Sequence, residues 1–167
     1  SIVDFDAQTG DVWIGAATMG GSEVTVTASG SITINDTLDV DDSTVSFDAQ
    51  TGDIRIDITE LTNSDVTMTA GTAMALRDFT AADSNITLTA GTTFDSESAD
   101  VSGGTLDLDA GGSVTISAFS AQGASVDINA GGNLAIQTCS LTGGTATMHT
   151  GGDASIDILT MTSGAAL

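Results

Sequence analysis

The sequence predicts an all-β fold, a single-stranded parallel β-helix (β-solenoid) of eight coils with 20 or 21 residues each. The first observation is a motif, apolar–x–apolar–x–Ala, that recurs along the whole chain, for instance as VDFDA, VTMTA and LDLDA. The second is its spacing, because copies begin 20 or 21 residues apart, at Val3, Val24, Val45, Val66, Ile86, Leu106, Val126 and Ala146. The third is a glycine within three residues after each copy, which predicts a corner there.

The motif predicts the first strand of each coil, since a spacing of two places its apolar residues on one face. We expect this face to lie in the core. The expected core contains Val3 and the central apolar residue of the first seven copies, which are Phe5, Val26, Phe47, Met68, Leu88, Leu108 and Ile128.

Two further apolar pairs in each coil predict a second and a third short strand. In the first coil the second strand supplies Val12 and Ile14, and later coils add Phe79, Phe119 and Cys139 to the expected core. The seven inward positions of the eight coils hold none of the 25 charged residues, which are 23 acidic and 2 basic. Because burying an unpaired charge is costly, this distribution supports the core assignment.

A column of Gly, Asn and Asp marks the corner before each first strand. It comprises Gly21, Asp42, Asn63, Asp83, Gly103, Gly123, Gly143 and Ser163. Since Gly, Asn and Asp tolerate left-handed backbone geometry, the column predicts a left-handed corner. The opposite corner contains the heptapeptide FDAQTGD twice, at 5–11 and 47–53, which is two coils of 21 apart. We interpret it as a widened corner used twice, with any cation between Asp11 and Asp53 as an addition.

Composition limits the partners of the chain. The formal charge is −21 and the only cationic residues are Arg55 and Arg77, so nucleic acid would be repelled and anionic membrane surfaces are disfavoured. No apolar stretch approaches the roughly 20 residues that cross a bilayer, and we expect no membrane insertion. The chain opens inside a predicted strand. We therefore expect residues 1–167 to be one continuous solenoid segment of a longer repeat protein.

The runs DAGGSVTI, NAGGNLAI and TGGDASI, in tandem units of 20 or 21 residues, resemble the repeats of filamentous-haemagglutinin-like exoproteins. These are bacterial adhesins and effectors exported by two-partner secretion. The resemblance covers all eight coils. It implies a right-handed β-helical shaft, a secreted or cell-surface location, and functional domains elsewhere in the polypeptide.

Aspartates at the left-handed corner suggest a cation site. Asp42 and Asp83 share the corner column and Asp41 adjoins it, so oxygen ligands would stack at the spacing of the coils. Calcium, the one cofactor we consider, takes six to eight oxygen ligands. The chain lacks the EF-hand loop and the calcium-binding nonapeptide pattern. The alternative, in which aspartate serves as a turn residue, needs no metal.

Other side chains suggest binding rather than catalysis. Trp13 is the one outward aromatic residue and a candidate contact for cell-surface or matrix glycans, or else an incidental surface residue. Acid catalysis by paired carboxylates needs a pocket that raises a pKa, and near-constant coils leave no long loop to build one. We therefore expect no enzymatic activity. His149 is expected to be solvated, and Cys139 to be a small buried hydrophobe.

These observations predict a structural protein. We expect a shaft segment of a large secreted or cell-surface bacterial adhesin that acts as a rigid spacer, with neighbouring coils of the same chain as its partners. The alternative is a self-assembling extracellular matrix or filament protein, because unpaired strand edges at the two ends are templates for end-to-end stacking.

Overall fold

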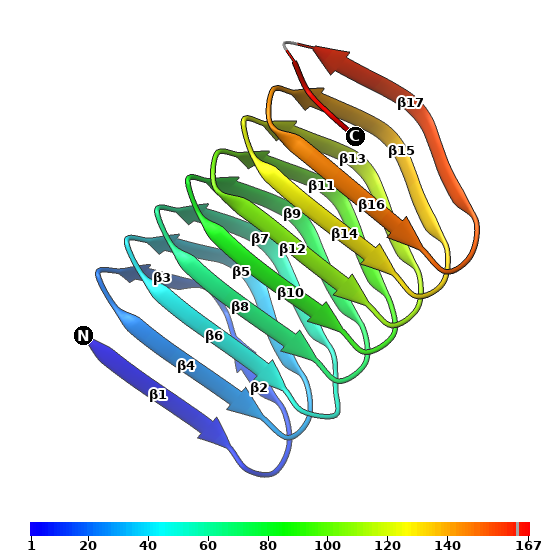
Figure 1. Cartoon of the computed structure of the whole chain (residues 1–167). Helices are drawn as coiled ribbons and strands as arrows, with labels where there is room; N and C mark the ends of the chain where they lie inside the picture. Colours follow the sequence, from blue (N-terminus) through cyan, green and yellow to red (C-terminus); the bar gives the residue numbers. More distant parts are fainter. Residues whose placement is uncertain (163) are drawn as a thin grey trace.

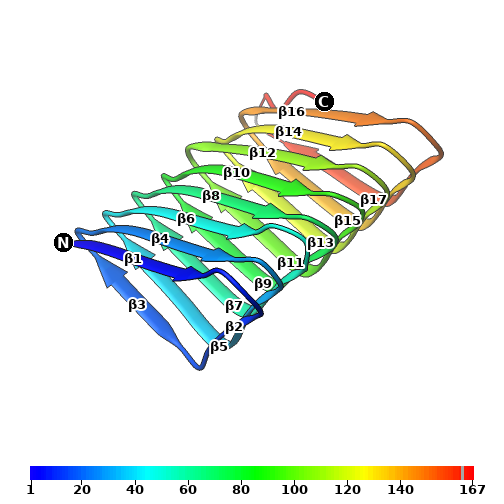
Figure 2. The ribbon, with the colours of Figure 1, turned by 90° about the horizontal axis from the view of Figure 1, so that it is seen from below.

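A computed structural model of the chain describes residues 1–162 and 164–167 and confirms the predicted β-solenoid. Within these residues, 17 strands form two parallel sheets and no helix occurs. Each coil crosses from one sheet to the other and returns one strand further along the axis, so the strands lie in two stacks (Figures 1 and 2). The prediction for Ser163 lies outside the described residues.

The first sheet contains one strand from each coil, in chain order. Its strands are β1 (Ile2–Ala7), β4 (Glu23–Ala28), β6 (Thr44–Ala49), β8 (Asp65–Ala70), β10 (Asn85–Ala90), β12 (Thr105–Ala110), β14 (Ser125–Ala130) and β16 (Thr145–Thr150). Equivalent residues of successive motifs are paired, for example Phe47 with Met68 and Leu88 with Leu108. The motif thus sets the register, because a slip of one residue would turn every apolar side chain outward.

The second sheet contains the other nine strands. They are β2 (Val12–Ile14), β3 (Ala17–Gly20), β5 (Ile32–Asp41), β7 (Ile54–Thr62), β9 (Met74–Ala82), β11 (Phe94–Ser102), β13 (Val114–Gln122), β15 (Leu134–Thr142) and β17 (Ala154–Thr162). Only the first coil has separate second and third strands, as β2 and β3. In later coils these two predicted strands form one continuous strand, so the expectation of three strands per coil is corrected to two.

The continuous strands turn through an elbow, which explains the difference from the prediction. Between inward Ile56 and Thr59, two successive residues, Asp57 and Ile58, are only half-buried. The pairing of β7 with β9 skips one position at this point, from Ile56 with Leu76 to Ile58 with Asp78. Hydrogen bonding resumes directly beyond the elbow, so the strand bends without ending. Sequence periodicity detects the change of face but not this continuity.

Apolar columns fill the space between the sheets. Most of the expected core side chains are buried, with 3% or less of their surface exposed: Val26, Phe47, Met68, Leu88, Leu108, Ile128, Phe79, Phe119 and Cys139. Val3 and Phe5, however, are 50% and 55% exposed, so the prediction that they are buried is wrong. Their strand β1 pairs with β4 on one side, and no described residue covers the other side.

The left-handed corner adopts the predicted geometry. Asp42, Asn63 and Asp83 have φ values of 46°, 47° and 49°, and four glycines of the column also have positive φ. Each of these residues donates its backbone N–H to a carbonyl of the next coil, as Asp83 does to Ser102 at 2.8 Å. The corner therefore continues the stacking of the coils instead of interrupting it.

A buried serine column follows this corner and was not predicted from the sequence. Ser43, Ser64 and Ser84 are 6% exposed or less. The hydroxyl of Ser64 donates to the Thr62 carbonyl at 2.7 Å and accepts the N–H of Ser43 at 3.1 Å. Ser43 and Ser84 make the same two kinds of contact. Each hydroxyl thus closes its own corner and joins it to the preceding coil.

Thr59 provides a test of how the core is built. Its side chain is fully buried in the column between Leu38 and Phe79, and its Oγ1 has no hydrogen-bond partner in the described part of the chain. Because a buried unpaired hydroxyl costs about 1–3 kcal/mol, we expect Thr59→Val to raise the free energy of unfolding by about 1 kcal/mol in urea denaturation. The matched control is Ser96→Ala, since the Ser96 hydroxyl donates to the Ser98 carbonyl at 3.0 Å. Destabilisation of both variants by similar amounts would contradict this description.

Candidate functional site

The structure brings the corner aspartates into one column but does not gather them into a cage. Asp42 and Asp83 lie two coils apart with Asn63 between them, and Asp41 ends β5 beside Asp42. The carboxylate of Asp83 lies over Gly103, where an added Cβ would come within 2.2 Å of its Oδ1. No cluster of three or more His, Cys, Asp or Glu side chains suited to a metal ion occurs among the described residues. The positive φ of Asp42 and Asp83 explains these two residues as corner formers, and calcium binding stays a prediction.

The two FDAQTGD copies hold carboxylates that join neighbouring coils. The Asp11 carboxylate accepts the Ser31 N–H at 2.7 Å, and the Asp53 carboxylate accepts the Ala73 N–H at 3.1 Å. Asp53 also accepts the Thr72 hydroxyl and pairs with Arg55. The hydrogen bond from Thr72, then that from Ala73, and the charge of Arg55 lower the pKa of Asp53 below its usual value of 3.8, although partial burial opposes them. The widened corner is thus also a cap for the following coil.

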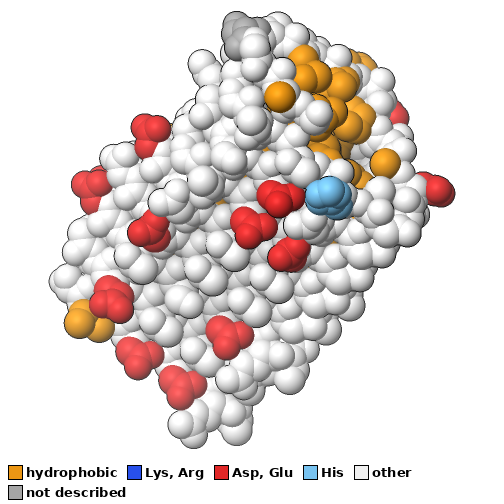
Figure 3. All heavy atoms as spheres, in the orientation of Figure 1, with side chains coloured by type: hydrophobic (Ala, Val, Ile, Leu, Met, Phe, Trp, Pro, Cys, Tyr) orange, Lys and Arg blue, Asp and Glu red, His pale blue; other side chains and the backbone are white. Residues whose placement is uncertain are grey.

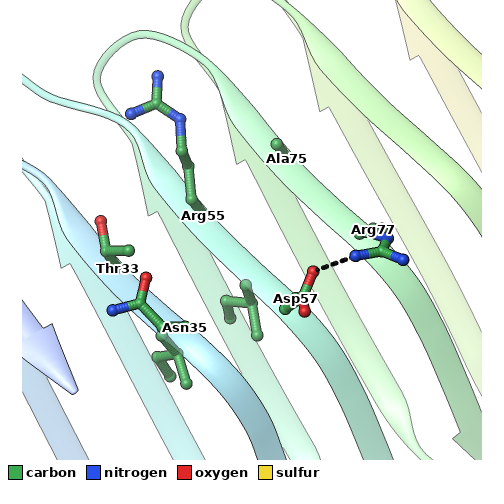
Figure 4. Close-up of a pocket in the computed structure, with 8 residues that line it drawn as sticks. Thr33, Asn35, Arg55, Asp57, Ala75 and Arg77 are labelled. Carbon is green, nitrogen blue, oxygen red and sulfur yellow. Dashed lines mark hydrogen bonds and ion pairs between the residues drawn. The ribbon is translucent and has the colours of Figure 1, made fainter. Parts of the chain in front are cut away.

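The outer face of the second sheet contains a shallow depression that runs along the solenoid axis. One hollow of about 350 Å³ is lined by the side chains of Thr33, Asn35, Arg55, Asp57, Ala75 and Arg77, all labelled in Figure 4. A second hollow of about 320 Å³ shares Ala75 and Arg77 with it and continues over Asp95, Glu97, Thr115 and Ser117. We call the two hollows together the axial trough.

Both arginines of the chain lie at the axial trough. Arg77 donates to Asp57 in the preceding coil at 2.9 Å, the contact drawn in Figure 4, and to Glu97 in the following coil at 3.3 Å. The hydrogen bonds to these two carboxylates raise the pKa of Arg77. Arg55 points away from Asp57 in Figure 4 and pairs with Asp53 at the neighbouring corner. Each guanidinium group is therefore held by ion pairs, and together these pairs involve side chains of three successive coils.

Trp13 lies in the same outward row as the trough. Its strand β2 pairs with β5 so that Trp13 is opposite Thr33, and Thr33 in turn is opposite Arg55. The indole is 69% exposed. The register thus places Trp13 two strands from Arg55, with Thr33 between them. The hollows between the coils are a feature that strand periodicity alone does not reveal.

The outer face of the first sheet is acidic. Asp107 is directly opposite Asp127, and Asp109 lies two residues along the same strand. Partial burial and the charges of Asp109 and Asp127 raise the pKa of Asp107 above its usual value of 3.8. His149 is exposed and lies opposite Asn129, in the same outward column as Asp109. In-register stacking therefore places like charges one strand spacing apart, about 4.8 Å.

Cys139 is fully buried between Phe119 and Leu159 in its column. Burial raises the pKa of its thiol, which disfavours the thiolate that a nucleophile or metal ligand requires. Across the described residues there is no helix long and apolar enough to cross a membrane.

The chain was compared with known proteins in three ways. A scan against protein-family models, a search of curated proteins and a search of solved structures each find no match to the chain.

Two aspartates give opposite predictions for the pH dependence of stability. The raised pKa of Asp107 means that its charge destabilises the fold at neutral pH, and that protonation on acidification removes this penalty. We expect Asp107→Asn to stabilise the fold at pH 7 by about 0.5 kcal/mol at low ionic strength. This gain should shrink as salt is added, because exposed charges are screened.

Asp53→Asn is the control, because we expect it to change the stability of the fold at pH 7 in the opposite direction. The lowered pKa of Asp53 gives stability that is present above its usual value of 3.8 and is lost as the pH falls through the lower folded-state value. We therefore expect Asp53→Asn to destabilise the fold at pH 7, and the loss to shrink as the pH falls below that usual value. Urea unfolding of both variants at pH 7 and in acid measures the two signs. Stabilisation by Asp53→Asn, or a salt-independent effect of Asp107→Asn, would contradict these assignments.

Proposed function

We propose that this chain is a shaft segment that acts as a rigid spacer in a larger secreted or cell-surface protein. The observation that carries the proposal is the uniform stacking of the coils. Both sheets pair every coil with the next through parallel strands, with one register shift between Ile34 and Thr37 of β5, and the two corners add further hydrogen bonds between coils. Bending such a rod would strain backbone hydrogen bonds, side-chain caps and apolar columns together.

Nearest-neighbour stacking suits a spacer. In a solenoid each coil contacts only its neighbours, so stability is approximately a sum of coil and interface terms, and length can grow without a new fold. With about 4.8 Å for each coil, eight coils give a rod on the order of 40 Å. The formal charge of −21 would keep parallel rods apart.

A surface location is supported by the resemblance of the DAGGSVTI-type runs to repeats of filamentous-haemagglutinin-like exoproteins. In such a protein the shaft would hold adhesive or effector domains away from the cell. The role proposed for these residues is mechanical and includes no catalytic step.

A second candidate is end-to-end assembly into an extracellular filament. It is favoured by the apolar side chains exposed on the end coils, which include Phe5 at 55%, Leu159 at 43% and Met161 at 40%. Hydrophobic side chains are also visible at the carboxyl-terminal end in Figure 3. Dilution separates the candidates, because a noncovalent filament shortens on dilution and a shaft within one polypeptide does not.

Rigidity can be measured by pulsed electron–electron double resonance between two spin labels. Asp6 and His149 occupy the same outward column in the first and eighth coils, seven strand steps apart. We expect Asp6→Cys/His149→Cys to give one narrow distance distribution with backbone attachment points about 34 Å apart. The native Cys139 is fully buried and should not be labelled.

The matched pair is Asp6→Cys/Asp109→Cys, which spans five strand steps of the same column. Its attachment points should be about 24 Å apart with an equally narrow distribution. A broad distribution for either pair, or a difference between the pairs unrelated to two strand steps, would refute the rigid spacer.

A further inference from the structure

We propose that the axial trough is a binding site for a linear, neutral oligosaccharide that lies along the solenoid axis. This site would be a lateral function of the shaft, and it does not depend on the spacer role. From Thr33 on β5 to Thr115 on β13 the trough crosses four strand steps, or about 19 Å. The two hollows are neighbours along the axis, with Ala75 and Arg77 lining both, so together they suit an extended ligand better than a compact one.

The polar groups of the trough favour a ligand rich in hydroxyl groups. Hydroxyls both donate and accept hydrogen bonds, so they need donors and acceptors side by side. The trough supplies this arrangement, because the Arg77 guanidinium lies between the carboxylates of Asp57 and Glu97. Thr33 and Asn35 line the same hollow and lie beside each other on its other side in Figure 4.

Charge selects a neutral ligand over a charged one. Arg55 and Arg77 are each paired with carboxylates, so they present directed donors without net positive charge. A polyanion would be repelled by a chain with a formal charge of −21. A polycation would be attracted to acidic surface on the first sheet as well, and therefore would not select the trough.

Apolar surface completes the site. Ala75 lines both hollows and lies between Arg55 and Arg77 in Figure 4. We expect a larger side chain at this position to fill the hollows. Trp13 extends the row beyond Thr33 and exposes 69% of its surface. An exposed indole offers an apolar face on which a sugar ring can stack, at the end of the trough. Each sugar unit of an extended β-linked chain has a length close to the strand spacing, so successive rings would meet successive coils.

The test uses the intrinsic fluorescence of Trp13, because the chain contains one Trp and no Tyr. Cellohexaose, xylohexaose and N-acetylchitohexaose are the neutral probes, and hexagalacturonate is the anionic probe of equal length. We expect at least one neutral hexamer to change the Trp13 emission saturably in the millimolar range or below. Hexagalacturonate should bind at least tenfold more weakly.

Two alanines of the same row provide matched variants. Ala75→Leu adds a larger side chain to the lining of both hollows, whereas Ala135→Leu adds the same atoms to β15, outside both hollows. We expect Ala75→Leu to weaken binding at least tenfold and Ala135→Leu to leave it unchanged. Trp13→Ala changes an exposed side chain and should also weaken binding at least tenfold, as measured by calorimetry. Thermal unfolding of each variant checks that the fold is retained.

Three results would overturn the site. These are the absence of a saturable response to every neutral hexamer, equal or tighter binding of hexagalacturonate, and equal losses of affinity in Ala75→Leu and Ala135→Leu. None of these results bears on the narrow distances expected for a rigid spacer, so the two proposals can fail separately.

Discussion

Parallel backbone pairing of each coil with the next is the constraint on which the rest of the structure depends. Once coils stack at a single strand spacing, every side chain lies beside its equivalent in the neighbouring coils. Inward positions must then be free of charge in every coil, because a single buried charge would have no partner. Phe79, Phe119 and Cys139 occupy one such column, with Ala99 between the two phenylalanines.

The same register also organises the surface. It aligns Asp107 with Asp127 and so creates repulsion that salt would relieve. It also aligns Asp57, Arg77 and Glu97, where one cation holds carboxylates of both neighbouring coils. At corners the register lets a side chain of one coil cap the backbone of the next. A solenoid face is therefore a set of columns. The axial trough lies along two of them, one from Thr33 to Thr115 and the other from Asn35 to Ser117.

Much of this fold could be predicted because the spacing of the repeated motif directly gives the register in which the strands of neighbouring coils pair. The left-handed corner was accessible from residue types, since few residues adopt positive φ. Phe5 was misassigned because periodicity shows which way a side chain faces and not whether a neighbouring coil covers it. Ser64 was missed because serine is ordinary in a turn, and its burial depends on the serine of the adjacent coil. The hollow over Ala75 depends on side-chain lengths across five coils, which one repeat does not display.

The register can be observed directly through NMR scalar couplings across backbone hydrogen bonds. In the stacked coils the Gly91 N–H donates to the Ala70 carbonyl, and the Gly111 N–H donates to the Ala90 carbonyl, each at 2.9 Å. We expect couplings between these pairs and between other residues about one coil apart along the whole chain. Couplings that join residues close in sequence, as in antiparallel hairpins, would contradict the stacking on which both proposals rest.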